Sequence, residues 1–266
     1  MPNKLKKIFL TNDDGWDSKG LKVLIETLRP LGQLTIVAPA SEKSASGHSM
    51  TLTRPMKLIS VDDDFYKMDD GTPTDCVFIG LNNLYDDENK PDLVISGINI
   101  GSNMGEDITY SGTVAGAIES VIQGVPAIAI SQVIDDKIKV NKNAWDYELA
   151  SKVIYDIAKK ILLEENFPLG ERKLLNINIP PCKEKECKGI KITKVGYREY
   201  GNDSYRYNSP RGEEVYWIGL HPLLWRSDES KSCDFEAVNN NFVSISPIHL
   251  DMTSYSDIGK LKDWIK

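Results

Sequence analysis

The first forty residues place an amphipathic helix pattern between two short apolar runs. The runs span residues 8–10 and 34–38, and their β-branched residues favour buried strands. Between them, apolar residues recur at i, i+3, i+4 and i+7 from Leu21 to Leu28, and Ser18 precedes them as a helix cap. A strand, a helix and a strand within about 30 residues are typical of the right-handed crossover between parallel strands. This feature predicts an α/β fold.

The same alternation continues to about residue 180. Short antiparallel strands are expected between Met50 and Tyr66. The remaining segments predict three helices and three buried strands, with Thr74 as the cap of the first helix: helices 76–84, 113–122 and 145–163, and strands 93–96, 125–130 and 174–179. We therefore predict a core over residues 1–180, with a mostly parallel sheet and helices on both of its faces.

Residues 181–242 differ from the core in composition. Tyr, Trp, Arg, Asn and Ser are frequent there, no helical periodicity is apparent, and strands are predicted near 190–195 and 215–219. Such a surface suits self-association as a dimer or tetramer, or it covers the sheet edge of the same subunit. A strand at 243–247 predicts that residues 243–266 return to the core.

Bulk properties exclude several classes of protein. The chain has 266 residues, 41% hydrophobic and 27% charged, which is ordinary for a globular protein with a sizeable core. A net charge of −7 argues against stable binding to nucleic acid. No apolar run approaches the roughly 18 residues of a membrane span, so we expect a cytoplasmic protein with no membrane contact. The four cysteines form no paired Cys-x-x-Cys elements, and the state of Cys182 and Cys187 stays open.

Two adjacent carboxylates follow the first predicted strand. Asp13 and Asp14 lie at its carboxyl end, where open α/β sheets bind ligands. Side by side they repel each other unless a cation lies nearby, and Mg²⁺ or Mn²⁺ takes such oxygen ligands and joins them to a phosphate. A turn with an Asp helix cap is the simpler alternative.

Two further polar segments also follow predicted strands. One is the serine-rich loop 41–49, which contains Ser44, and the other is the stretch 96–103. Ser and Asn oxygens are neutral ligands that complete a hard-metal site. Ser111-Gly112-Thr113 then precedes a helix, whose free N–H groups and positive dipole end favour an anion. Each piece alone is weak, but their joint placement at strand ends favours a phosphate site with a metal.

These segments resemble the SurE (survival protein E) family in order and spacing. The resemblance spans residues 7 to about 130 and resumes more thinly near 175–180, 210–219 and 244–247. It rests on these motifs: Thr11-Asn12-Asp13-Asp14-Gly15, Ser44-Ala45-Ser46-Gly47-His48-Ser49, Gly71-Thr72-Pro73-Thr74-Asp75, Ser96-Gly97-Ile98-Asn99 and Tyr110-Ser111-Gly112-Thr113. The resemblance implies a Rossmann-like fold and a metal-dependent phosphatase that acts on nucleoside monophosphates.

The resemblance also implies roles for individual residues. The metal ligands are Asp13, Asp14, Ser44 and Asn99, and the phosphate-binding residues are Asn103, Ser111, Gly112 and Thr113. Asp13 and Asp14 are then also catalytic through the metal, and His249 is a candidate proton donor to the leaving group. His48 either braces the serine-rich loop or acts near the metal.

The resulting hypothesis is a 5′/3′-nucleotidase. A divalent cation, Mg²⁺ or Mn²⁺, activates hydrolysis of a nucleoside monophosphate to nucleoside and phosphate, with water as the nucleophile. A non-catalytic nucleotide sensor and a metal-dependent nucleotidyl or glycosyl transferase are the alternatives. The sequence does not determine the preferred base, the 5′ or 3′ position, or the native metal.

Overall fold

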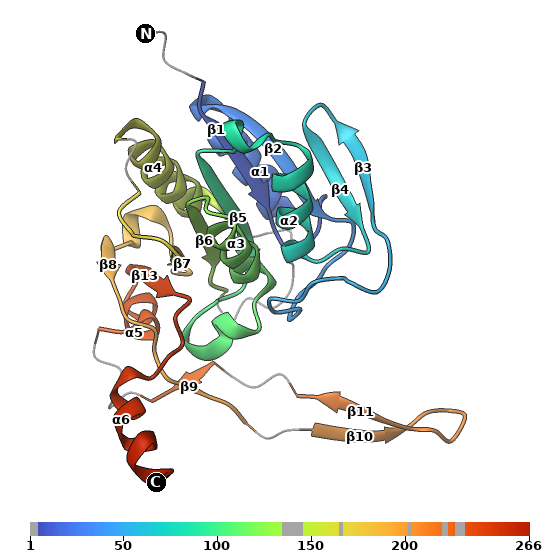
Figure 1. The fold of residues 1–266 in the computed structure, drawn as a ribbon, viewed down its shortest axis with the longest axis vertical. Helices are drawn as coiled ribbons and strands as arrows, with labels where there is room; N and C mark the ends of the chain where they lie inside the picture. Colours follow the sequence, from blue (N-terminus) through green and yellow to red (C-terminus); the bar gives the residue numbers. More distant parts are fainter. Residues whose placement is uncertain (1–4, 135–145, 165–166, 202–203, 220–222, 227–231) are drawn as a thin grey trace.

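The computed structural model describes residues 5–134, 146–164, 167–201, 204–219, 223–226 and 232–266. Its described strands form a nine-stranded central sheet in the order β3-β4-β2-β1-β5-β6-β7-β13-β8 (Figure 1). Six of them, from β4 to β7 in that order, are parallel: β4 (Phe65–Asp69), β2 (Gln33–Pro39), β1 (Lys7–Thr11), β5 (Leu93–Ile100), β6 (Ala127–Gln132) and β7 (Lys173–Ile179). The predicted α/β class is confirmed.

The edges of this sheet depart from the parallel direction. At one edge, β3 (Lys57–Asp62) pairs antiparallel with β4. At the other, β13 (Val243–His249) pairs antiparallel with β7, and β8 (Ile190–Ile192) pairs parallel with β13. A short strand of the 181–242 segment therefore belongs to the same sheet as the core.

Helices cover both faces of the sheet, with one apolar core on each. The alternation of side chains along β1 decides which residue enters which core. Ile8 and Leu10 pack on the face of α1 (Lys19–Leu28) and α4 (Glu148–Glu164). Phe9 packs on the opposite face, with α2 (Pro73–Asn83) and α3 (Gly112–Ile122).

Helix starts follow local capping chemistry. The Ser18 hydroxyl accepts a hydrogen bond from the backbone N–H of Leu21, as predicted for α1. The predicted start of α2 was wrong, because Thr72 and Asp75 form a reciprocal capping box with Pro73 at the first helical position. Thr72, rather than Thr74, is therefore the cap. The predicted start of the later helix at 145 lies outside the described residues.

The C-terminal third contains helices that the sequence pattern did not predict, namely α5 (Asp234–Asn239) and α6 (Tyr255–Trp264). Helix α5 is only six residues long, too short for a clear helical period. Helix α6 has apolar residues at every third position, Tyr255, Ile258 and Leu261, but none of its residues is buried. The remaining elements are short: β9 (Arg198–Glu199), β10 (Ser204–Asn208), β11 (Glu214–Ile218), β12 (Leu224–Trp225) and the 3₁₀ turns η1 (Arg29–Leu31), η2 (Asp87–Asn89), η3 (Gly105–Thr109) and η6 (Glu184–Glu186).

Strands β10 and β11 form a hairpin that projects away from the body of the molecule (Figure 1). Every residue of both strands is exposed, including Tyr205, Tyr207, Tyr216 and Trp217. Elsewhere, all four cysteines are free thiols. Among the described helices, none has the length and apolar character needed to cross a membrane.

Candidate active site

Three chain segments meet at the carboxyl end of the parallel strands. Strands β1 and β5 are neighbours, with Thr11 opposite Ser96, so the residues that follow them emerge side by side. Helix α3 begins at the same edge, and its Gly116 lies so close to the sheet that a Cβ there would be 3.0 Å from Thr11 Cγ2. The structure thus brings the acidic pair, the Asn99 segment and the start of α3 to one place.

Asp13 lies directly against the start of α3. It is 4% exposed, and its Oδ1 accepts a hydrogen bond of 2.5 Å from the Thr113 hydroxyl. A Cβ on Gly112 would be 2.8 Å from Asp13 Cβ and 3.0 Å from Oδ2. Glycine at 112 is therefore what permits the carboxylate to approach the helix terminus.

Burial raises the pKa of Asp13 above its usual value. The Thr113 hydrogen bond acts in the opposite direction, and the negative charge of Glu42 adds to the rise. A cation beside the carboxylate would offset the cost of burying it. The hydroxyl of Ser46 is buried without a hydrogen-bond partner, and it would also be 3.0 Å from a Cβ on Gly112. An orphaned hydroxyl near a buried carboxylate fits a hard cation, which takes oxygen donors.

Asp14 and Asn99 are fixed by backbone contacts around the end of β5. Asp14 Oδ2 accepts a hydrogen bond of 3.2 Å from the backbone N–H of Ile100. The Asn99 Nδ2 donates to Gly101 O at 3.1 Å, so the amide oxygen Oδ1 is the atom of this side chain that could bind a cation. The register between β5 and β6 shifts between Ser96 and Asn99, and such irregularities re-aim the side chains beside a site.

The serine-rich loop approaches the site from a third direction. The backbone N–H of Lys43 donates to Asp13 O at 2.8 Å, so the loop is attached to the acidic turn itself. Ser44 is exposed, and its hydroxyl donates to Glu42 Oε1 at 2.9 Å. Ser46, after the left-handed Ala45, is the serine whose hydroxyl faces Gly112 and Asp13.

His48 braces this loop against α3. Its Nε2 is 2.9 Å from Glu119 Oε2, and Gln123 Nε2 donates to Glu119 Oε1 at 2.9 Å. Burial acts to raise the pKa of Glu119, but these two hydrogen bonds and the His48 charge outweigh it, so the pKa lies below its usual value. Of the two roles considered for His48, the structure therefore favours bracing.

Asn103 is attached to strands β6 and β7 rather than to the acidic turn. Its Nδ2 donates to Ser131 Oγ at 2.8 Å, and its backbone is held by Asn176 and Asn178. Ser111 caps α3 by accepting from the backbone N–H of Val114. A phosphate contact from Asn103 stays a prediction, whereas Ser111, Gly112 and Thr113 form the helix terminus beside Asp13.

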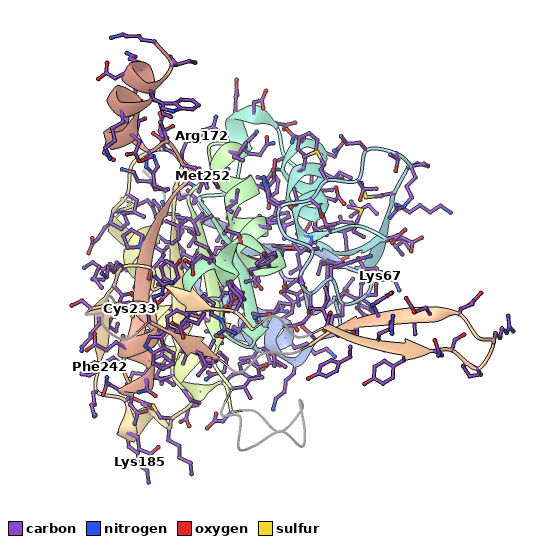
Figure 2. The ribbon with its side chains drawn as sticks, turned by 90° about the horizontal axis from the view of Figure 1, so that it is seen from below. Lys67, Arg172, Lys185, Cys233, Phe242 and Met252 are labelled. Carbon is purple, nitrogen blue, oxygen red and sulfur yellow. The ribbon has the colours of Figure 1, made fainter. Side chains whose placement is uncertain are left out.

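The structure does not bring His249 to this site within one chain. Because β13 is antiparallel to β7, His249 pairs with Lys173 at the start of β7 rather than at its carboxyl end. The backbone N–H of Leu250 then donates to Arg172 O at 3.1 Å. Figure 2 shows Arg172 and Met252 near each other, beyond the start of β7. The expectation of a proton donor at His249 overlooked the direction of this strand.

Three further residues were missed by sequence reasoning. Ser46 lies in the serine-rich motif and Glu119 in the predicted helix 113–122. The sequence does not show the contacts that these two side chains make. Tyr147 gave no sequence signal: it is buried, its hydroxyl has no hydrogen-bond partner, and burial together with the nearby charge of Asp14 raises its pKa. Across the described residues, no group of three or more His, Cys, Asp or Glu could hold a metal, so neutral oxygens must complete any site at Asp13 and Asp14.

Comparisons with known proteins identify the family and the fold. A family model described as Survival protein SurE matches residues 8–202. The chain is 61% identical over 261 residues to a protein of Aliarcobacter butzleri (strain RM4018) named 5′-nucleotidase SurE, covering 98% of this chain and 99% of that protein. A protein of Helicobacter hepaticus with the same name is 57% identical, covering 98% and 100%. The crystal structure of the SurE protein from Aquifex aeolicus aligns with a TM-score of 0.81 and 43% identity, covering 98% of this chain and all of that one.

Proposed function

Because the chain belongs to the SurE family, we propose that it is a metal-dependent nucleotidase that hydrolyses nucleoside 5′-monophosphates to nucleoside and phosphate. Relatives of similar length carry the name 5′-nucleotidase, which supports the 5′ position. The observation that carries the proposal is the contact of the buried Asp13 carboxylate with the N-terminus of α3 through Gly112. It sets a cation site and a phosphate site side by side.

The oxygen donors at the sheet edge suit a divalent cation such as Mg²⁺ or Mn²⁺. Asp13, Asp14 and Asn99 would hold it, together with Ser44 after rotation of its exposed hydroxyl, and the orphaned Ser46 hydroxyl is a further donor. When bound, the cation polarises the phosphoryl group and increases the acidity of coordinated water. The buried carboxylate supports such a site, since a cation removes the unfavourable burial of its charge.

The α3 terminus is suited to bind the phosphate. Its first N–H groups, at Gly112 and Thr113, have no partner within the helix and point along a dipole that favours anions. The Thr113 N–H also contacts the Asp13 carboxylate, so a phosphate would share this donor with Asp13. As the phosphoryl oxygens gain charge in the transition state, these fixed donors stabilise it without reorganising. We call Ser111, Gly112 and Thr113 the phosphate cradle. The Thr113 hydroxyl is hydrogen-bonded to Asp13, so it orients the carboxylate as well as the phosphate cradle.

Water is the proposed nucleophile, because both carboxylates are occupied with the cation and the backbone. The water oxygen bonds to phosphorus, the phosphorus–oxygen ester bond breaks, and the nucleoside oxygen leaves with a proton. The family resemblance suggested His249 for that proton, but its place beside Lys173 argues against this role within one chain. Solvent is then the proposed proton source.

The test is phosphate release from AMP, GMP, CMP and UMP with Mn²⁺ or Mg²⁺. We expect turnover of these monoesters, complete loss with EDTA, restoration by added cation, and near inertness of bis-p-nitrophenyl phosphate. Undiminished turnover after exhaustive chelation would contradict the role of the cation. Comparable kcat/KM on the diester would contradict a site built for a terminal phosphate.

The 181–242 segment is proposed to mediate self-association as a dimer or tetramer. A lone two-stranded hairpin is marginally stable in water, and β10–β11 carries exposed aromatic residues at Tyr205, Tyr207, Tyr216 and Trp217. Burial against a second copy would remove this surface from water. On this proposal residues 1–180 are the catalytic core, 181–242 the contact element, and 243–266 the returning strand and tail.

A further inference from the structure

Tyr110 lies at the entrance to the phosphate cradle. It immediately precedes Ser111, yet its side chain is 60% exposed whereas Ser111 is 6% exposed. Ring atoms at this position can contact whatever part of a substrate extends outward from a phosphate held at the start of α3. On a nucleotide, that part is the sugar and the base.

The backbone of Tyr110 is fixed on both sides. Its N–H donates to Asp107 O at 3.1 Å, and its carbonyl accepts from the backbone N–H of Gly47 at 2.9 Å. Gly47 belongs to the serine-rich loop, and Asp107 belongs to η3. Tyr110 therefore joins the serine-rich loop to the phosphate cradle, and its backbone is held in place on both sides.

A second tyrosine meets Tyr110 at nearly a right angle. The ring centroids of Tyr110 and Tyr200 are 6.3 Å apart and the rings are inclined by 79°, an edge-to-face arrangement. Tyr200 is 45% exposed. The two rings thus form a corner, and both side chains remain largely exposed.

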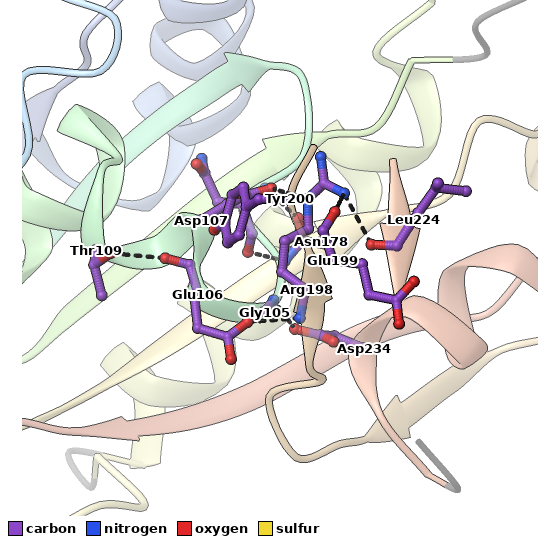
Figure 3. Close-up of polar contacts among 11 residues, drawn as sticks. Gly105, Glu106, Asp107, Thr109, Asn178, Arg198, Glu199, Tyr200, Leu224 and Asp234 are labelled. Carbon is purple, nitrogen blue, oxygen red and sulfur yellow. Dashed lines mark hydrogen bonds and ion pairs between the residues drawn. The ribbon is translucent and has the colours of Figure 1, made fainter. Parts of the chain in front are cut away.

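Polar contacts hold Tyr200 in this orientation (Figure 3). Its hydroxyl donates to Asp107 Oδ1 at 2.8 Å, and the buried Arg198 binds the other oxygen of the same carboxylate, with Nε 3.2 Å from Oδ2. The Arg198 guanidinium also lies 5.1 Å from the centre of the Tyr200 ring. The same Asp107 therefore holds Tyr200 by its side chain and Tyr110 by its backbone.

We propose that Tyr110 and Tyr200 are the nucleobase-binding residues of this enzyme, with the base stacked on Tyr110 and bounded by Tyr200. The inference rests on the proposed nucleotidase function and adds the part of the substrate that the metal and phosphate site does not reach. Aromatic side chains stack on any base, because every base has a π-face. Two fixed rings beside a phosphate site are suited to a nucleotide and offer little to a phosphorylated sugar.

The experiment compares AMP with ribose 5-phosphate, which has the same phosphoryl group and sugar but no base. We expect Tyr110→Ala to raise KM for AMP by about 5-fold to 100-fold, the range that loss of one base stack gives, while kcat/KM for ribose 5-phosphate stays within about twofold. Tyr110→Phe should retain the wild-type KM for AMP. Tyr200→Ala should raise KM for AMP, and Tyr200→Phe should raise it less because the ring remains.

Tyr255→Ala is the matched control. Tyr255 has a similar exposure of 68% but lies on α6, after the strand end that pairs with Lys173. It should leave both substrates unchanged, and retained turnover of ribose 5-phosphate shows that each variant is folded.

Two results would overturn the base-binding role. One is an unchanged KM for AMP in Tyr110→Ala, and the other is an equal loss on AMP and ribose 5-phosphate, which would make Tyr110 a brace of the cradle. The proposed function fails separately, if the wild-type protein with Mn²⁺ releases phosphate from neither substrate.

Discussion

Replacing Gly112 by alanine adds a single methyl group at the contact between the acidic pair and the phosphate cradle. That carbon would be 2.8 Å from Asp13 Cβ, whereas ordinary van der Waals contact begins at 3.4 Å, and it would be 3.0 Å from both Asp13 Oδ2 and Ser46 Oγ. The start of α3 and the Asp13 carboxylate must therefore move apart by several tenths of an ångström. A displacement of 1 Å at a reacting group can cost about 100-fold in rate, so we expect kcat/KM to fall by about 10-fold to 100-fold.

The fold should tolerate this change better than the chemistry does. Alanine is favoured over glycine in a helix by about 1 kcal/mol, which offsets part of the roughly 1–3 kcal/mol that overpacking costs. We expect the free energy of unfolding to fall by no more than about 2 kcal/mol. Phosphate release from AMP at saturating Mn²⁺ and thermal unfolding of the same samples measure the two effects.

Two glycines of the same chain serve as controls. A Cβ on Gly259, in α6, would meet nothing within 4 Å, so Gly259→Ala should keep full activity. A Cβ on Gly116 would meet Thr11 and Ser96 at 3.0–3.1 Å but not Asp13, so Gly116→Ala should lose stability with a smaller loss of activity. If Gly112→Ala stays within threefold of the wild type in kcat/KM, the close approach of Asp13 to the cradle is not what the reaction requires.

Three further outcomes are expected. Asp13→Asn should stay folded but lose more than 90% of its activity at saturating metal, a loss of at least about 1.4 kcal/mol in transition-state stabilisation, and isothermal titration with Mn²⁺ should detect weaker binding. His48→Ala should destabilise the protein at pH 7 by about 1–3 kcal/mol, because it leaves the Glu119 carboxylate buried without this partner. In the wild type the pKa of Glu119 is lowered, so the pair stabilises the fold above the usual value of 4.5, and this stabilisation is lost as pH falls through the folded-state pKa. In His48→Ala, burial raises the pKa of Glu119, so the deficit in melting temperature relative to the wild type should shrink from pH 7 toward pH 4. A deficit that stays constant with pH would contradict this assignment. Trp217→Asp should lower the mass in light scattering at micromolar concentration, and a wild-type monomer there would refute self-association through the hairpin.

The parallel core was predictable because its signals are local and periodic. Each buried strand from β1 to β7 carries its own apolar run, and α1 and α3 carry their own serine caps. Helix α6 was not predicted, and none of its residues is buried, so its apolar side chains pack on no core of the described chain. The cap of α2 was misplaced by two residues and its start by three, because two threonines compete for the cap and the reciprocal bond to Asp75 favours Thr72.

The candidate site, too, could be predicted from the sequence only in part. Asp13, Asn99 and Thr113 could be placed together, because carboxyl ends of parallel strands share one edge of a sheet. His249 could not, because an apolar run does not reveal whether a strand runs parallel or antiparallel to its neighbour. Ser46 was not predicted as a further donor beside Ser44, because it follows the left-handed backbone of Ala45, which no periodic pattern reports.

The oxygen-only donor set proposed here would tie the enzyme to the metal supply of its surroundings. Imidazole and thiolate ligands favour zinc and copper, whereas carboxylate, hydroxyl and amide oxygens favour Mg²⁺ and Mn²⁺ and bind them less tightly. Around Asp13 and Asp14, the described residues offer no group of three or more His, Cys, Asp or Glu for a metal. On the proposed function, occupancy would follow the free concentration of hard cations, so a change in the supply of Mg²⁺ or Mn²⁺ would change the rate without any new protein being made.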